Sequence, residues 1–570
     1  MSIYAAGLLV SIVVYLLVGS YAGRKVKHLE DYFVAGRQAP TLLIVGTLVA
    51  SLMSTNAFMG ETGIAYAGNP GLIVLMTAIN CIGYVAGALY FGRFLRRSRA
   101  LTVAEYFGQR FDSRRVQSVA GLTVVIGCTA YLVMVTQGTA TIIHEVTGLS
   151  FATTLIVTWL GYTLFTLYSG SRGVVLTDTI MFLLFSAVAF MGLAVVLDEA
   201  GGWLAAIRDL ATFAAKPKIL SWHGVLGPES SWHTPLDALV WCVILGVAWS
   251  IVVAVSPWQA SRYLMAKDEH TVMRSAVITA GVVLFLYLVL MLCGAAINLL
   301  NPDIVPAQEN MIWAALNLMP VTVGVLLMSG IMAAGLSSAS TFLSLSGFSI
   351  SNDIFGRREG AGPLQLRSSR VAMLAIGVVA LAIALLLPEG RLFWITYFAG
   401  TRFASSWGPG AFMSVWSRRI TEAAAFWGII AGLAGNLLTN LVGITGILEL
   451  PVLLDPILVG VLVSYLVIVM VSRRGEVSER ENRRRERLHR APESEFDAAR
   501  LKRTLGWSAA LAVSGMVLFV LMVLFYVLPY RSATGDRATS EFLFALACGM
   551  SLVIAGLLGW WGARKSYARR

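Results

Sequence analysis

Hydroxyl side chains recur at helical spacing in residues 330–355, GIMAAGLSSASTFLSLSGFSISNDIF. Four of them follow the pattern i, i+3, i+4, i+7 on one helix face and a fifth flanks it: Ser337, Ser340, Thr341, Ser344 and Ser338. Neutral oxygens are the ligands that a hard cation such as Na⁺ prefers. Hydroxyl stripes also join membrane helices through hydrogen bonds. The stripe alone therefore leaves cation binding and helix packing open.

A second polar cluster lies in residues 46–63, GTLVASLMSTNAFMGETG. The polar and small residues near its middle are Ser51, Ser54, Thr55, Asn56, Gly60 and Glu61. In a membrane, an unwound segment frees backbone carbonyls and needs such neighbours, whereas a continuous helix does not. The alternative is a kink filled by packing. An unwound segment that faced the hydroxyl stripe would supply, together with it, about five neutral oxygens for a cation.

Two charged residues lie within apolar segments. Asp178, in GVVLTDTIMFLLF, is either a carboxylate close to water at a helix start or a cation ligand or relay. Arg402, in TYFAGTRFASSWGPG, needs a partner, because an uncompensated Arg at the bilayer centre costs about 2.5–3.5 kcal/mol. That partner is either Glu61, in a structural pair, or an anionic solute.

The composition places these residues in a membrane protein. Of 570 residues, 57% are hydrophobic and 13% charged, and the mean hydropathy is +0.76, which excludes a soluble enzyme. The apolar blocks predict an all-α polytopic protein with about 15 transmembrane helices. They lie near residues 3–20, 41–67, 72–92, 117–143, 152–170, 173–197, 237–261, 275–298, 321–351, 371–388, 392–416, 421–440, 455–472, 505–529 and 541–562. No histidine cluster, cysteine pair or nucleophile constellation indicates a membrane enzyme.

The basic residues predict the orientation of these helices. Most of the 43 Lys and Arg residues fall in alternate loops, which the positive-inside rule assigns to the cytoplasm. The prediction is a multi-pass protein of the cell (plasma or inner) membrane, with its N-terminus outside and its C-terminus cytoplasmic. The net charge of +12 is then a topological signal rather than a sign of nucleic-acid binding.

A second interruption is predicted in the span at 237–261, which contains Ser256 and Pro257. Interruptions in the first helices of two successive five-helix groups favour inverted repeats, the LeuT-like architecture, with a binding site between them. The predicted organisation has five parts: a leading helix and cytoplasmic loop (1–40), a ten-helix core (41–420, with repeats 41–197 and 237–416), two additional helices (421–472), a charged cytoplasmic loop (473–504), and two C-terminal helices with a tail (505–570).

Residues 1 to about 472 resemble the sodium:solute symporter family, which includes proline, glucose, sialic acid, pantothenate and monocarboxylate symporters. The matching motifs are DYFVAGR (31–37), ASLMSTNAFMG (50–60), LTDT (176–179), RYLMAKDEH (262–270), GLSSAST (335–341), NDIF (352–355) and WGPGAFMSVWSRR (407–419). The resemblance implies one leading helix, a core of two inverted five-helix repeats, and further C-terminal helices.

The resemblance also implies ligands for one or two Na⁺ ions. The common sodium site of the family matches the carbonyls of Ala50, Met53 and Ala334 and the hydroxyls of Ser337 and Ser338. The second site of some members matches Asp178, Ser337, Ser340 and Thr341. The family's solute contacts match Ser54, Asn56, Ala57 and Trp249. Sugar transporters have polar side chains where Asn56 and Ala57 stand, which argues against a sugar.

Together these observations predict a Na⁺-coupled symporter that imports a small organic solute by alternating access, and not an enzyme. The expected solute bears a carboxylate, as a monocarboxylate or a pantothenate-like compound does, with Arg402 as its counter-ion. The alternative solute is a zwitterionic amino acid or osmolyte such as proline. A transporter-like sensor that acts through a separate partner, and proton coupling through Asp178, are less favoured. The expected partners are the solute and the lipid bilayer, with no nucleic acid and no obligate protein partner evident.

Overall fold

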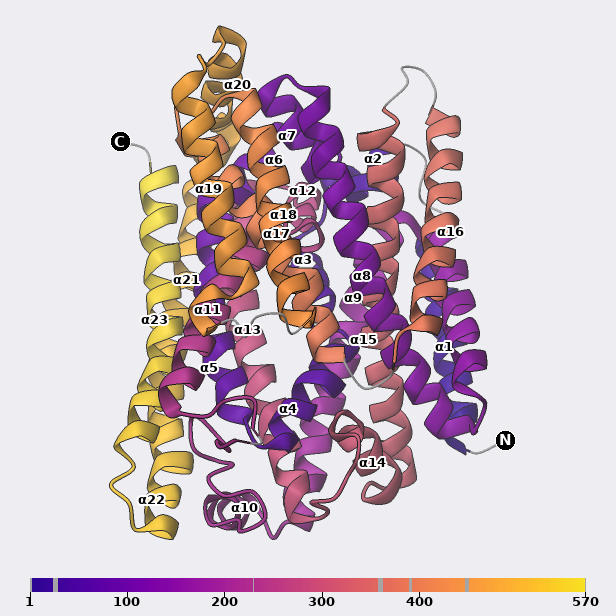
Figure 1. The fold of residues 1–570 in the computed structure, drawn as a ribbon, viewed down its shortest axis with the longest axis vertical. Coiled ribbons are helices and arrows are strands. Elements are labelled where there is room, and N and C mark those ends of the chain that lie inside the picture. Colours follow the sequence, from indigo (N-terminus) through magenta and orange to yellow (C-terminus); the bar gives the residue numbers. More distant parts are fainter. Residues whose placement is uncertain are drawn as a thin grey trace.

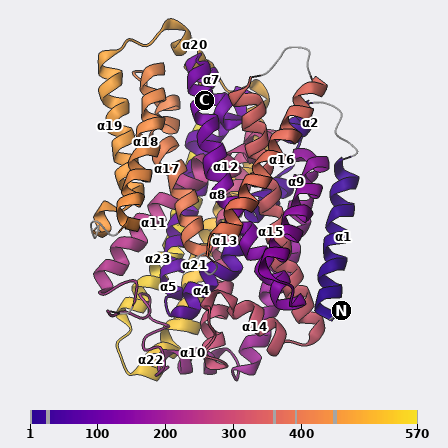
Figure 2. The same cartoon turned by 45° about the vertical axis from the view of Figure 1, so that its right-hand side comes forward.

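The computed structural model describes residues 3–23, 29–228, 230–356, 362–388, 392–445 and 451–568. Over these residues the chain is helical, and its one β-bridge joins Ala39 and Ala266. Long helices run roughly side by side, with short helices and loops at both ends (Figure 1). Figure 2 shows α18 (Glu422–Thr445) and α19 (Pro456–Arg474) at one edge and α1 (Ile3–Gly23) at the opposite edge.

The helices of the first half of the chain are α2 (Leu29–Val34), α3 (Thr41–Leu52), α4 (Thr62–Ala67), α5 (Pro70–Gly87), α6 (Arg93–Ser98), α7 (Val103–Phe111), α8 (Arg114–Thr147), α9 (Phe151–Glu199), α10 (Trp203–Ala211), α11 (Pro235–Val255), α12 (Pro257–Met265) and α13 (Glu269–Ala296). Those of the second half are α14 (Asn310–Asn317), α15 (Val321–Phe348), α16 (Gly362–Leu386), α17 (Leu392–Trp416), α20 (Glu479–His489), α21 (Ala498–Met522), α22 (Leu528–Thr534) and α23 (Thr539–Tyr567).

Within the described residues, 11 helical stretches are long and apolar enough to cross a membrane, or 12 with the bent pair α3 and α4. The other predicted spans coincide with α1, the first part of α9 and α17, which fall short of those limits. The spans predicted at 152–170 and 173–197 belong to one helical segment, α9, which contains two apolar stretches, Phe151–Leu167 and Gly173–Glu199. A multi-pass helical membrane protein is confirmed.

Both predicted helix interruptions are present. The first follows α3, where Met53 leaves helical geometry (φ −82°, ψ 80°), and the helix beyond a π-helical turn at Asn56–Glu61 is bent by 55°. The second lies between α11 and α12, where Ser256 is extended (φ −60°, ψ 145°). Pro257 then begins α12, a position that needs no backbone N–H.

The segment at 473–504, predicted as a charged loop, contains the helix α20. Ser478 and Glu481 form a reciprocal capping box at its start. One face of α20 is buried through Glu481, Arg485 and Leu488. The high charge of the segment suggested a solvated loop, but hydrogen bonds dock it on the core. Arg97 and Arg110 of the core donate to its Leu488 and Glu481 carbonyls, and its Arg484 donates to the Gln109 carbonyl.

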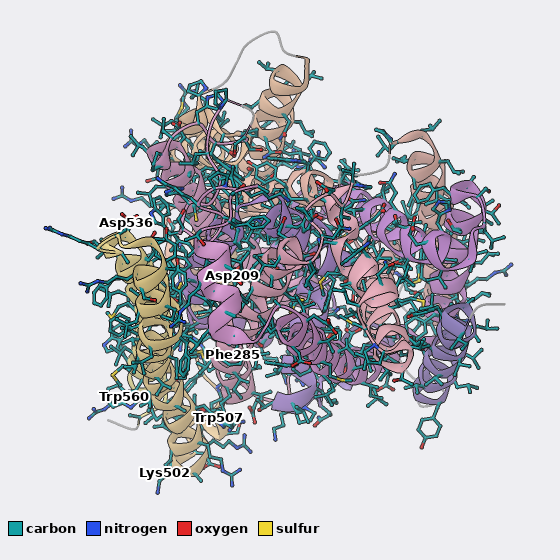
Figure 3. The ribbon with its side chains drawn as sticks, turned by 90° about the horizontal axis from the view of Figure 1, so that it is seen from below. Asp209, Phe285, Lys502, Trp507, Asp536 and Trp560 are labelled. Carbon is teal, nitrogen blue, oxygen red and sulfur yellow. The ribbon has the colours of Figure 1, made fainter. Side chains whose placement is uncertain are left out.

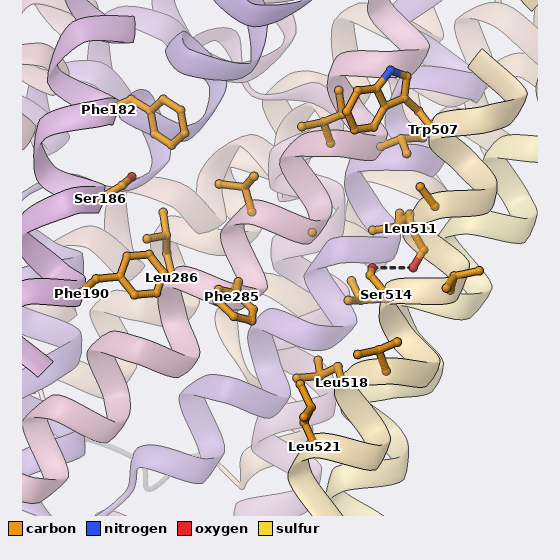
Figure 4. A pocket seen from close by; sticks show the side chains of 18 residues that line it. Phe182, Ser186, Phe190, Phe285, Leu286, Trp507, Leu511, Ser514, Leu518 and Leu521 are labelled. Carbon is orange, nitrogen blue, oxygen red and sulfur yellow. Dashed lines mark hydrogen bonds between the residues drawn. The ribbon is translucent and has the colours of Figure 1, made fainter. Parts of the chain in front are cut away.

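The last helices form a hairpin, α21 and α23, that packs against α5 and α13. In Figure 3, Lys502 and Asp536 mark its two ends, and Trp507 and Trp560 lie along it. An apolar cavity of about 760 Å³ separates α21 from α9 and α13. Its lining in Figure 4 is formed by large apolar side chains with two hydroxyls, Ser186 and Ser514. A cavity with so little polar surface is unsuited to a charged solute.

Glycines allow the hairpin to pack closely, and one of them provides a stability prediction. A Cβ on Gly515 would lie 2.5 Å from the carbonyl oxygen of Gly549, whereas nothing lies within 4 Å of a Cβ on Gly506 in the same helix. We expect Gly515→Ala to lower the free energy of unfolding by about 1–3 kcal/mol, because the clash is with backbone.

The measurement is thermal unfolding of the purified protein in detergent. Gly506→Ala, the matched control, gains helix propensity without a clash and leaves the melting temperature unchanged or higher. Equal melting temperatures for the two variants would contradict the close packing of α21 against α23.

Candidate ion and solute site

The carboxylate of Asp178 joins four helices at the centre of the molecule. Asp178 lies on α9 and is fully buried. Thr47 of α3 donates a hydrogen bond of 2.5 Å to one of its oxygens, and Ser337 of α15 donates one of 2.6 Å to the other. Arg262 of α12 lies 3.6 Å away. Two sequence-predicted residues, Asp178 and Ser337, are therefore in direct contact, and Asp178 is not a carboxylate close to water.

Arg262 is a member of this network that the sequence analysis missed. The predicted span at 237–261 ends before Arg262, but Arg262 lies in α12 and is 2% exposed. Its Nη2 donates to Thr341 Oγ1 at 2.5 Å, so one guanidinium connects Asp178 with Thr341. The sequence contained one indication that Arg262 is helical: it lies five residues after Pro257, where a new helix begins.

The hydroxyl stripe of α15 faces the break after α3. Ser338 Oγ donates to the carbonyl of Ala50 at 3.4 Å. A Cβ on Gly335 would lie 2.9 Å from Thr55 Cγ2, so α15 lies directly against the interrupted segment. Ala334 and Met53 are buried on these same two segments, while the Ser340 hydroxyl turns back to the carbonyl of Ser337. The predicted oxygens thus come from adjoining segments.

Gln259 ties the second interruption to the first, and the sequence analysis missed it as well. Its Nε2 donates to the Leu48 carbonyl (3.3 Å) and to Ser51 Oγ (3.2 Å). Its Oε1 is buried without a hydrogen-bond partner among the described residues, as is the hydroxyl of Ser256. Because α12 is anchored to α3 by Gln259 and to α9 by Arg262, the two broken helices meet at one place.

Aromatic side chains gather on the other side of the break. A Cβ on Gly400 of α17 would lie 3.0 Å from both Trp249 Cη2 and Tyr131 Oη, so α8, α11 and α17 converge there. Tyr131 also stacks on Phe342, with ring centroids 4.6 Å apart. Trp249 is therefore beside α17, the helix that contains Arg402. The other predicted solute residues, Ser54, Asn56 and Ala57, are buried at the break, and Asn56 Oδ1 has no hydrogen-bond partner among the described atoms.

Arg402 is buried without a carboxylate partner among the described residues. Arg402 is 3% exposed, and its guanidinium lies 3.0 Å from the centroid of the Phe398 ring. Within the described chain, its Nε and Nη2 atoms have no hydrogen-bond partner. The structural pair with Glu61, one of the two interpretations from the sequence, is not formed, and Glu61 Oε2 is itself without a hydrogen-bond partner there. The guanidinium therefore retains unused donors for an anion.

The Asp178 network leads to a stability prediction. Asp178→Asn leaves the Arg262 guanidinium buried without a counter-charge, and Arg262→Gln leaves the carboxylate without its cation. Removing one partner of a buried pair costs about 3–5 kcal/mol. We expect each single variant to unfold at a lower temperature and the double variant to lose less than the sum of the two. Thermal unfolding in detergent measures the cycle, and strictly additive losses would show that the two groups do not interact.

Comparison with known proteins identifies the family. Residues 32–432 match the sodium:solute symporter family. The chain is 25% identical over 446 residues to the sodium/pantothenate symporter of Escherichia coli (strain K12), covering 75% of this chain and 89% of that protein. It is 24% identical over 475 residues to the osmoregulated proline transporter OpuE of Bacillus subtilis (strain 168), covering 79% and 92%. The fold matches the solved structure of a Na⁺-coupled sialic acid symporter with a TM-score of 0.70 at 19% identity, covering 84% of this chain and 99% of that one. The chain therefore belongs to the sodium:solute symporter family and is a Na⁺-coupled solute symporter, not an enzyme.

Proposed function

We propose that this symporter imports a small organic solute bearing a carboxylate, a monocarboxylate or a pantothenate-like compound. The observation that supports this proposal is the buried guanidinium of Arg402 with two unused nitrogen donors. A buried cation is stable only with a partner, and a bound carboxylate supplies both charge and paired acceptors. Asn56, with its unused oxygen, and Trp249 offer a hydrogen-bond acceptor and an apolar surface for the rest of the solute.

We propose that Na⁺ binds where α15 meets the end of α3. The ligands are the carbonyls of Ala50, Met53 and Ala334 and the hydroxyls of Ser337 and Ser338. The 3.4 Å contact between Ser338 and Ala50 supports this arrangement. A second Na⁺ would use Asp178, Ser337, Ser340 and Thr341, of which Asp178 and Ser337 are in contact. All donors in both sets are oxygens, which fits a hard monovalent cation.

Coupling follows from the position of these ligands. The Ala50 and Met53 carbonyls belong to the interrupted segment that also contains Ser54, Asn56 and Ala57. A Na⁺ ion that fixes this segment against α15 pre-forms the solute contacts. Linkage then requires that the solute strengthen Na⁺ binding by the same factor. Alternating access releases both to the cytoplasm when the segment and α15 move apart.

For the orientation, we propose that the end containing α7 and α20, at the top of Figure 1, faces the cytoplasm. The support is the distribution of basic residues. The segment 473–504 and the α6–α7 region are rich in arginine, whereas the loops at the opposite end contain few basic residues. The N-terminus is then outside and the C-terminus inside.

A zwitterionic amino acid or osmolyte such as proline is the second candidate solute. The relative named as an osmoregulated proline transporter supports it at a similar identity to the pantothenate symporter. Its carboxylate could also use Arg402, but its ammonium group would then need an acceptor. Asn56 Oδ1 and Glu61 Oε2 are unused acceptors within the described residues.

Ser338→Ala provides the test of the Na⁺ ligands. We expect the Na⁺ concentration for half-maximal uptake to rise about tenfold, since one hydroxyl ligand of a few is lost. At saturating Na⁺ the solute concentration for half-maximal uptake should change little. The assay is uptake by proteoliposomes under an inward Na⁺ gradient. Ser346→Ala is the matched control, because Ser346 is buried on the same helix but donates only to Phe342 within it. Equal effects of the two variants would exclude Ser338 as a ligand.

Arg402→Gln tests the counter-ion. With a pool of labelled monocarboxylates, pantothenate and amino acids, we expect Na⁺-driven uptake of carboxylates to fall at least tenfold, because a charge-assisted pair contributes about 1.5–3 kcal/mol. Arg402→Lys keeps the charge and should recover part of the uptake. Carboxylate uptake that persists at the wild-type rate in Arg402→Gln would assign Arg402 a structural role.

A further inference from the structure

A polar cavity of about 380 Å³ lies between α20 and the α6–α7 region, far from the proposed ion and solute site. It is lined by Arg97, Ser98, Tyr106, Gln109, Arg110, Arg484, Arg487 and Leu488. Its walls come from segments more than 370 residues apart in the chain. These segments lie together at the top of the molecule in Figure 1. Four guanidinium groups thus border one cavity.

Two of the four guanidinium groups are neutralised by carboxylates. Arg97 forms a two-pronged pair with Glu269, at 2.5 and 2.7 Å. Arg484 contacts Asp112 at 2.5 Å. Both arginines also donate to backbone, Arg97 to the Leu488 carbonyl and Arg484 to the Gln109 carbonyl. These contacts hold the cavity walls together and use up the charge of Arg97 and Arg484.

The other two guanidinium groups have no such partner. Arg110, which is 3% exposed, donates to the carbonyls of Ser414 (2.6 Å) and Glu481 (3.1 Å). Arg487 is exposed at the rim. In the described part of the chain, no carboxylate oxygen lies within 4.0 Å of either one. The nearby carboxylate of Glu481 is occupied by the amides of Ser478 and Glu422.

The carboxylate of Glu105 is also occupied, by Gln109 Nε2 and the amide of Leu101. These hydrogen bonds leave the charges of Glu105 and Glu481 in place, but neither residue lines the cavity, whose lining, among the described residues, has four guanidinium groups and no carboxylate. Such a lining suits an anion such as a phosphate group, which carries about −1.5 to −2 at pH 7.

We propose that this cavity binds a phosphate group. Arginine forks match the planar pairs of phosphate oxygens, and the rigid guanidinium plane favours phosphate over a spherical anion. Arg487 and Arg110 are the two free charges, and Gln109 offers an amide beside them. The phosphate is that of an anionic lipid headgroup or of a soluble phosphate compound. Both are available at this end if it faces the cytoplasm, an orientation that rests on the proposed function.

Phosphate binding has a mechanical consequence for the linker. Arg110 belongs to α7 and Arg487 to α20, so a phosphate held by both clamps the segment 473–504 onto the transporter core. Without it, the like charges of Arg110 on α7 and Arg487 on α20 face one another across the cavity and oppose the docking. The docked state of α20 is thus stabilised by the bound anion.

The first test measures binding of radiolabelled inorganic phosphate to the purified full-length protein in detergent by equilibrium dialysis. Arg487→Gln should raise the Kd at least tenfold. The matched control is Arg483→Gln on the same helix, because Arg483 is exposed, pairs with Glu479 at 2.8 Å and does not line the cavity. The control should bind as wild type does. An equal loss in both variants would show diffuse attraction to a basic helix and overturn the proposal.

The second test distinguishes the source of the phosphate and uses short-chain lipids and inorganic phosphate as the probes. Binding of the protein in nanodiscs to short-chain phosphatidic acid is compared with binding to phosphatidylcholine, and with displacement by inorganic phosphate. The site is supported if the wild-type protein binds either the lipid or inorganic phosphate saturably and Arg487→Gln loses this binding. The probe that binds identifies the source of the phosphate. Binding of neither overturns it.

Trypsin cleavage provides a readout of the clamp itself. Cleavage within the arginine-rich segment 473–504 should slow at least threefold when the anion is bound to the wild-type protein, and should not slow for Arg487→Gln. None of these measurements uses transport, so a failure of the phosphate site and a failure of the proposed solute are distinguishable.

Discussion

A buried carboxylate sets the arrangement of the whole core. Asp178 has no solvent contact, so its charge is stable only if other groups replace water. Thr47, Ser337 and Arg262 do so, and they come from α3, α15 and α12. Each of these helices is thereby held at the same depth. The two interrupted helices and the hydroxyl stripe converge because a side chain from each of them contacts the two carboxylate oxygens of Asp178.

The interruptions themselves follow from this constraint. A continuous helix in place of α11 and α12 would not free α12 to turn Gln259 and Arg262 toward α3 and α9. Ser256 in extended geometry and Pro257 at the start of α12 provide that freedom at a single residue. At the other break, Met53 leaves the helix one turn after Val49, just where α15 presents Ser338. The polar groups and the free backbone therefore occupy the same layer.

Much of this was predictable from sequence because polar residues are costly in hydrocarbon and stand out there. The breaks at 46–63 and at Ser256, and the shared face of Ser337 and Thr341, followed from residue type and spacing alone. The contacts of Arg262 and Gln259 did not. The apolar run ends near residue 261, so the charged Arg262 was expected to lie outside the span. Arg262 is buried because a new helix, α12, begins at Pro257. Whether Arg402 pairs with Glu61 depends on the distance between the two side chains, and their positions along the chain do not give that distance.

The docked helix α20 within the segment 473–504 was not predicted, for a different reason. Net charge and low hydropathy indicate solvation, but guanidinium groups also bind backbone carbonyls, which a sequence pattern does not reveal. Arg110, Arg97 and Arg484 each donate to a carbonyl across the contacts of α20 with α6 and α7. The linker is therefore part of the folded molecule.

Two buried charges of the core differ in how far they are satisfied, and this difference connects structure to transport. Asp178 accepts from two hydroxyls and faces a guanidinium, whereas Arg402 has unused donors within the described residues. A satisfied charge stabilises one packing of the helices, and an unsatisfied one favours any state in which a ligand completes it. α17, which contains Arg402, meets Trp249 of α11 at Gly400. Under the proposed function, a carboxylate that pairs with Arg402 binds near this contact, and its binding energy favours the packing of α17 against α11 in which the pair forms.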